Sequence, residues 1–253
     1  NNSMFCSNYA QTENNIYGSY ESNIDNYFYE NCNDTPSVSE WINPNGGSFE
    51  FFGSWFPLYI PVSTDDVLFT LPNEYTVTFD QDHINKTLHV LDGNVTVDIG
   101  NNFYDLVGFN EPGLIVGEDT NATNTEVSLT IQSGSTSCIS TVIAKNIGSK
   151  GSLTLQGNST YLLAEQELIV GNSGDGKLNL LDGAYLVSRN GTIGAHPGSY
   201  GTVNLQGEGT TWELPFFLTI DHGTVEVGAG ASLQPGYFFA LFGDGHLGGD
   251  GSI

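Results

Sequence analysis

Ser152-Leu-Thr-Leu-Gln-Gly157, Lys177-Leu-Asn-Leu-Leu-Asp-Gly183 and Thr202-Val-Asn-Leu-Gln-Gly207 are three versions of one pattern, a short alternating run that ends at a glycine. A second short apolar run follows each of them, as in Leu168-Ile-Val-Gly171. The unit recurs about every 25 residues. Periods of ~20–50 residues are typical of solenoids, because one unit cannot bury its own apolar face.

Alternation along each run predicts β-strands in which successive side chains point to opposite faces. Equivalent positions of successive units should then stack in columns about 4.8 Å apart. We expect two inward columns and one outward column: Leu153, Leu178, Val203 and Val225; Leu155, Leu180, Leu205 and Val227; and, facing outward, Thr154, Asn179, Asn204 and Glu226. The predicted fold is an all-β, right-handed β-solenoid (a parallel β-helix) of about eight coils.

The N-terminal part of the chain does not follow this pattern. Residues 1–40 are rich in Asn and Tyr, and we expect an irregular arm that lies on its own solenoid or on a neighbouring molecule. Residues 41–70 contain Trp41, Trp55, paired glycines and prolines, and we interpret them as a cap. A cap is needed because the first coil would otherwise expose apolar side chains and unpaired strand edges. Residues 71–253 are assigned to solenoid repeats of about 22–25 residues.

The chain carries 29 Asp and Glu against five Lys and Arg, a net charge of −24. Nucleic-acid binding needs basic side chains that replace counterions on phosphates, so this charge excludes DNA and RNA as partners and, on the same ground, anionic membrane surfaces. Two interpretations remain. Like charges keep the protein soluble, or clustered carboxylates bind a divalent cation such as Ca²⁺. No Asp-x-Asp-x-Asp-Gly loop supports the second, and we expect no other cofactor.

Three cysteines are present. Cys6 and Cys32 lie in the predicted arm, and we predict a disulfide between them, which in the chain-entropy model would stabilise the arm by about 3 kcal/mol. Cys138 then has no cysteine left in the chain with which to pair. We expect a small buried apolar residue there, with an intermolecular disulfide as the alternative.

Seven Asn-x-Ser/Thr sequons occur, one of them at Asn1. The predicted N-glycosylation sites are Asn33, Asn85, Asn94, Asn121, Asn158 and Asn190. Asn158 and Asn190 come just after glycine corners, where a glycan would point away from the strands. The alternative is that polar turns generate sequons by chance.

The chain begins at Asn1 rather than Met, which we interpret as a processed, secreted chain. It contains no apolar run of about 18 residues, so we expect no membrane insertion. The last residues, Leu247 to Ile253, read like the middle of another repeat, and we expect further residues beyond them.

One series of motifs carries a family resemblance. It comprises Trp41, Gly46-Gly47, Trp55, Pro61, Asp65-Asp66-Val67, then repeated Leu-x-Leu-x-x-Gly and Leu-Ile-Val-Gly units, then the closing Gly-Asp-Gly-Ser-Ile. In this order the motifs resemble the β-helical repeat proteins related to autotransporter passenger domains and surface-anchored bacterial exoproteins. The resemblance covers about residues 41–253. It implies a secreted or surface-displayed adhesin or structural protein, and it nominates no catalytic residues. The abundance of sequons departs from that family.

An enzyme is the least supported hypothesis. A polysaccharide lyase needs basic residues, yet Arg189 is the only arginine and lies beside the Asn190 sequon. A glycoside hydrolase needs two carboxylates about 5–9 Å apart, but Asp65 and Asp66 are adjacent in a strand and should point to opposite faces. Asp182 and Glu208 are interpreted as solvated turn residues. The histidines show no metal-ligand spacing: they are His83, His89, His196, His222 and His246.

We therefore predict an extracellular or cell-surface structural protein that self-assembles head to tail into a fibre or a surface layer. The alternatives are a monomeric adhesin or glycan-binding stalk and, third, a polysaccharide-active enzyme.

Overall fold

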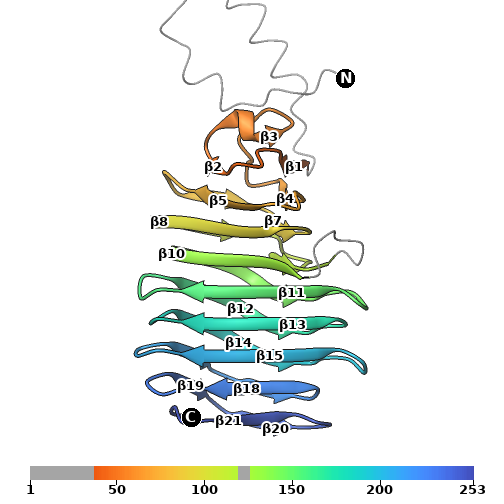
Figure 1. Ribbon diagram of the computed structural model, residues 1–253, viewed down its shortest axis with the longest axis vertical. Coiled ribbons are helices and arrows are strands. Elements are labelled where there is room, and N and C mark those ends of the chain that lie inside the picture. Colours follow the sequence, from red (N-terminus) through yellow and green to blue (C-terminus); the bar gives the residue numbers. More distant parts are fainter. Residues whose placement is uncertain (1–36, 119–125) are drawn as a thin grey trace, which may run out of the picture.

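The computed structural model describes residues 37–118 and 126–253 and forms a β-solenoid of about 8 turns. The strands stack along one long axis, with the first strands at one end and β20 and β21 at the other (Figure 1). The all-β solenoid predicted from the repeat is confirmed. The predicted arm, except for residues 37–40, lies outside the described residues.

The coils build three walls, and within each wall every strand pairs in parallel with its equivalents in the neighbouring coils. Wall A consists of β2 (Gly47–Ser48), β5 (Glu74–Thr78), the first parts of β8 (Asn94–Leu106) and β10 (Val127–Ile143), β11 (Lys150–Gln156), β13 (Asp175–Leu181), β15 (Tyr200–Gln206), β18 (Gly223–Val227) and β21 (His246–Gly249).

Wall B consists of β6 (His83–Asn85), the end of β8, the middle of β10, the first halves of β12 (Tyr161–Val170) and β14 (Tyr185–Ile193), β16 (Thr211–Leu214) and β19 (Ser232–Pro235). Wall C consists of β1 (Val38–Trp41), β4 (Asp66–Phe69), β7 (Thr87–Val90), β9 (Leu114–Val116), the ends of β10, β12 and β14, β17 (Phe217–Ile220) and β20 (Phe238–Leu241).

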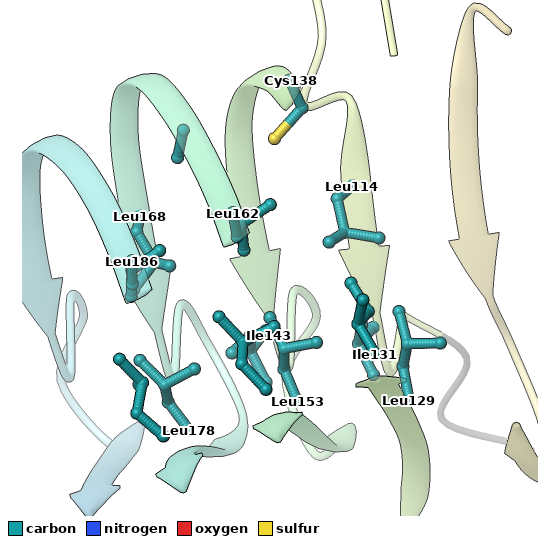
Figure 2. Close-up of a cluster of buried hydrophobic side chains, with 14 of the residues drawn as sticks. Leu114, Leu129, Ile131, Cys138, Ile143, Leu153, Leu162, Leu168, Leu178 and Leu186 are labelled. Atoms are coloured by element: carbon teal, nitrogen blue, oxygen red, sulfur yellow. The ribbon is translucent and has the colours of Figure 1, made fainter. Parts of the chain in front are cut away.

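The predicted inward columns are present in wall A. Leu153 is the register partner of Leu178, which is followed by Val203 and Val225, and all four are fully buried. Figure 2 shows Leu129, Leu153 and Leu178 on successive coils around one shared interior. Burial of such side chains contributes about 1.5–3 kcal/mol each relative to exposure, so the columns supply much of the stabilisation.

The outward column of wall A is linked by hydrogen bonds along the axis. The Asn204 Nδ2 donates to the Asn179 Oδ1 at 3.1 Å, and the Asn179 Nδ2 donates to the Thr154 Oγ1 at 3.2 Å. The partners in both pairs are 25 residues apart, which is the length of one coil here.

An aromatic cluster closes the N-terminal end of the interior. Trp41 and Trp55 meet edge to face with ring centroids 4.9 Å apart, and Phe49 packs on Trp55 at 4.8 Å. Both indole N–H groups donate to backbone carbonyls, those of Asn43 and Phe49. The short strand β3 (Trp55–Phe56), which follows the 3₁₀ turn η1 (Phe52–Ser54), pairs antiparallel with β1. On its other edge β1 pairs in parallel with β4, so the stack begins before residue 71.

Close stacking at the corners leads to a test of the coil-to-coil distance. Gly194 (φ 67°) and Gly198 (φ 88°) both have a left-handed backbone, but a Cβ on Gly194 would lie 1.9 Å from the His222 carbonyl oxygen, whereas nothing lies within 4 Å of a Cβ on Gly198. We expect Gly198→Ala to cost about 1–2 kcal/mol through its backbone conformation alone. We expect Gly194→Ala to cost about 1–3 kcal/mol more, because the next coil must move. Urea unfolding of both variants measures the difference, and equal losses would contradict the stacking.

Leu178 provides a second test. Leu178→Ala should lower the free energy of unfolding by about 2–5 kcal/mol, because the side chain is fully buried between two register partners and a cavity would remain. Its neighbour Lys177 is exposed, and Lys177→Ala should change stability by less than about 0.5 kcal/mol. Both values come from denaturant unfolding followed by circular dichroism. A loss of less than about 1 kcal/mol for Leu178→Ala would be incompatible with this core.

Candidate functional site

Aromatic side chains form a column on the outside of wall B. In register, Phe103 is followed by Ser135, then Tyr161, Tyr185 and Thr211, one on each of five successive coils, and we call these residues the aromatic column. Their inward neighbours in the same strands, such as Leu162 and Leu186, are buried, so strand alternation turns the column toward solvent. Phe103 is 56% exposed and Tyr185 is 36% exposed.

The two tyrosines of the aromatic column stack on each other. Their ring centroids are 5.8 Å apart and the ring planes differ by 15°. Their neighbours along the axis, Ser135 and Thr211, are short side chains. The two tyrosine rings therefore lie between two small hydroxyl side chains along the axis.

Carboxylates flank the aromatic column. In the adjacent outward column of the same wall, Asp105 is followed by Ser137 and, further along, by Glu213. The Ser137 hydroxyl donates to the Asp105 Oδ1 at 2.6 Å. The Tyr185 hydroxyl donates to the Glu213 carboxylate, and this hydrogen bond, with burial and the negative charge of Glu213, raises the pKa of Tyr185 to about 12. Burial, followed by the Glu213 charge, also raises the pKa of Tyr161.

Reasoning from the sequence missed the aromatic column, because its members lie on different coils and are far apart in the chain. A signal was nevertheless present. Tyr161 and Tyr185 both begin the strand that follows a glycine corner, at Gly157 and Gly183. Aligning the corners would have placed the two tyrosines at equivalent positions.

The predicted glycosylation sites occupy different environments. Asn94 and Asn158 are exposed. Asn190 is partly buried. Its Nδ2 donates to the Gln166 carbonyl at 3.3 Å, and its Oδ1 has no hydrogen-bond partner among the described residues. Asn85 is fully buried and donates to the Val62 carbonyl at 2.9 Å, so the folded protein has no room for a glycan on Asn85. Asn1, Asn33 and Asn121 lie outside the described residues.

Among the cysteines, Cys6 and Cys32 also lie outside the described residues, and their disulfide stays a prediction. Cys138 is free and buried, and its Sγ lies 3.2 Å from the Thr141 hydroxyl. Burial raises the pKa of the Cys138 thiol to about 12. The thiol is therefore protonated and unreactive in the folded protein.

The acidic pair considered for hydrolysis is divided between two faces. Asp65 is buried and accepts hydrogen bonds from the hydroxyls of Ser37 and Ser39 and from the Val62 backbone N–H. Asp66 accepts from the Lys86 ammonium at 3.1 Å and from the Thr87 hydroxyl. Both carboxylates are engaged in holding the first coils together. Asp182 lies at a corner and accepts from the Gln156 side chain at 3.2 Å.

Four of the five histidines contact a carboxylate: His83, His89, His222 and His246. Within residues 37–118 and 126–253, no group of three or more His, Cys, Asp or Glu side chains could hold a metal ion. Binding of Ca²⁺ stays a hypothesis that rests on net charge alone.

The two ends of the stack carry exposed apolar side chains. On the outside of the cap these are Val38, Ile42, Phe51, Phe52, Phe56 and Leu58, which we call the cap surface. On the last coil they are Leu241, Phe242 and Ile253. Among the described strands, β20 pairs only with β17 and β21 pairs only with β18, so the outer edges of both carry no strand partner.

Comparison with known proteins found no matching protein-family model, no matching curated protein and no matching solved structure. The part of the chain that the structure describes contains no helix long and apolar enough to cross a bilayer. The site is therefore interpreted from its own geometry.

A partly buried ion-pair cluster beside wall C, formed by His89, Glu118 and Lys145, predicts how stability depends on pH. Burial alone would raise the pKa of Glu118, but the Lys145 ammonium, which donates a hydrogen bond to it, and the charge of His89, whose ring nitrogen lies 3.0 Å away, hold that pKa below its usual value of 4.5. A folded-state pKa that is lowered stabilises the protein above the unfolded-state pKa, and this contribution disappears as the pH falls through the folded-state value.

We therefore expect Glu118→Gln to lower stability by about 1 kcal/mol at neutral pH, and the difference from the wild type to shrink steadily below about pH 4.5. Urea unfolding at several pH values measures it. Glu208→Gln, at an exposed turn, is the matched control and should change stability little at any pH. A Glu118→Gln effect that is independent of pH would contradict the charged interaction.

Proposed function

We propose that the protein is an extracellular structural subunit that associates end to end into a fibre or layer. The observation that carries the proposal is the position of the exposed apolar side chains. The cap surface and the exposed residues of the last coil lie at opposite ends of the long axis (Figure 1). A contact between two different ends is heterologous, and such contacts produce open filaments when the rotation does not close.

Two phenyl rings of the cap surface contact each other. Phe51 is 56% exposed and Phe52 is 46% exposed, and their ring centroids are only 5.5 Å apart. Contiguous apolar patches on soluble proteins often mark interaction sites. At this end β3 covers the outer edge of β1, so a neighbouring molecule would attach through side-chain packing rather than by extending the strand pairing of wall C.

An extracellular location is the part of the proposal that rests on sequence. Its support is the resemblance to surface-displayed β-helical proteins, the predicted disulfide between Cys6 and Cys32, and two exposed sequons at Asn94 and Asn158. The net charge of −24 is consistent with a soluble exported chain.

Sedimentation of the full chain tests the association. The mean mass should rise with protein concentration, and negative-stain images should show rods longer than one molecule. The double substitution Phe51→Ser and Phe56→Ser should shift the population to monomers, because it removes apolar area from the cap surface.

Phe109 is 82% exposed on a side loop and provides the control. Phe109→Ser removes a phenyl ring of the same size and should leave the association unchanged. A wild-type chain that is monomeric at every concentration would refute end-to-end assembly. Equal effects of the cap and loop substitutions would show that the cap surface is not the contact.

A glycan-binding stalk is the second candidate function, and the aromatic column of wall B favours it. A polysaccharide-active enzyme is the third, and its sequence candidates Asp65 and Asp66 are bound to structural partners on opposite faces.

A further inference from the structure

We propose that the aromatic column of wall B binds a glycan chain built of amino sugars. This goes beyond end-to-end association, because wall B lies along the side of the stack and involves neither the cap surface nor the last coil. Three features of wall B support this: the aromatic surface, the sign of the charge around it, and the pairing of the strands beneath it.

The aromatic surface extends over several rungs and is partly exposed. Phe103 and Tyr161 lie two rungs apart with Ser135 between them, a separation of about 10 Å along the axis at the usual strand spacing. Tyr185 follows on the next rung. Aromatic side chains offer apolar contact with low entropy cost, and the serine and threonine hydroxyls beside them supply hydrogen bonds. Such a surface suits rings that are apolar on their faces and polar at their rims, as sugar rings are.

The charge around the aromatic column selects among sugars. Asp105 and Glu213 flank it, and their carboxylates accept hydrogen bonds from Ser137 and Tyr185. A uronic-acid polymer would be repelled by these groups and by the net charge of −24. A sugar ammonium is attracted by the carboxylates and by the faces of aromatic rings. Charge complementarity therefore favours a cationic glycan of the glucosamine type.

The strands below the aromatic column argue against a peptide ligand. Extended peptides usually add to a free strand edge and gain backbone hydrogen bonds. In the middle of wall B, β10 pairs with both β8 and β12, and β14 pairs with both β12 and β16, so these edges are already occupied. The ligand must therefore bind through the side chains of the aromatic column, which extends over five successive rungs and so suits an extended polymer.

Titration calorimetry of the full chain with a fully deacetylated glucosamine hexamer tests the proposal, at mildly acidic pH where the amino groups carry charge. Phe103→Ala and Tyr161→Ala should each weaken binding about tenfold, and Asp105→Asn should weaken it about fivefold. Circular dichroism melting confirms that each variant is folded. Phe103 is more than half exposed, so Phe103→Ala gives a readout even if Tyr161→Ala destabilises the wall.

Two matched controls separate the site from general attraction. Phe109→Ala removes an exposed phenyl ring elsewhere, and Asp175→Asn removes one exposed carboxylate from wall A; both should bind the hexamer like the wild type. A loss for Asp175→Asn equal to that for Asp105→Asn would overturn the proposal in favour of non-specific charge attraction. Equal binding of oligolysine with the same dependence on Phe103 and Tyr161 would overturn the glycan assignment, and no binding of the hexamer would overturn the proposal altogether.

The test is independent of end-to-end association. Tyr161→Ala should leave the sedimentation behaviour unchanged, and the cap substitutions should leave hexamer binding unchanged. Failure of one proposal therefore leaves the other intact.

Discussion

Coil-to-coil register is the constraint on which the rest of this structure depends. Leu153, Leu178 and Val203 occupy the same position in successive coils, and the strands that carry them hydrogen-bond in parallel without a shift. A shift of one residue would turn every buried side chain to solvent. The same register places Asn179 above Thr154 outside the wall and holds Tyr161 against Tyr185 on wall B. The buried core, the outward column of wall A and the aromatic column of wall B therefore all follow from the same coil-to-coil register.

Reasoning from the sequence succeeded where alternation and period agree. The two inward columns of wall A and the outward column with Asn179 and Asn204 follow from a period of about 25 residues and strand alternation. The strand β6 departs from hydrophobic alternation: its inward positions are His83 and Asn85, while Ile84 points outward and is 48% exposed. Hydrophobic alternation would give this strand the opposite orientation. His83 is accommodated because its ring lies 4.4 Å from the Phe49 ring and its Nε2 contacts Glu50 at 2.8 Å.

The candidate site was harder to predict than the fold. Its residues are determined by pairing in wall B, and wall B is built from half-strands whose boundaries fall at corners and bulges, such as the shift between Ala164 and Glu167. Such irregularities move the register by a residue, and their positions are difficult to predict from the sequence. The burial of Asn85 could not be predicted either, since a sequon records the residue type and not the face on which the side chain lies.

The interior changes character along the axis. The first coils are filled by tryptophan, phenylalanine and tyrosine rings, whereas the later wall A columns consist of leucine and valine. Inside the early coils the hydroxyls of Tyr75, Tyr104 and Thr136 have no hydrogen-bond partner among the described residues. Burial raises the pKa of both tyrosines. The aromatic end therefore buries large side chains but leaves some buried hydroxyls without hydrogen bonds among the described residues. The aliphatic part repeats the same kinds of side chain from coil to coil.

That repetition determines how such a protein changes length. Ser152 and Lys177 are register partners, so the segment from Leu153 to Lys177 is one complete turn, and joining Ser152 directly to Leu178 reproduces the same order of inward and outward positions. Duplication or loss of a whole turn creates no new kind of contact, since each turn touches only its neighbours. The distance between the two ends is therefore a heritable quantity that can vary in steps of one turn while the surfaces at the ends stay the same.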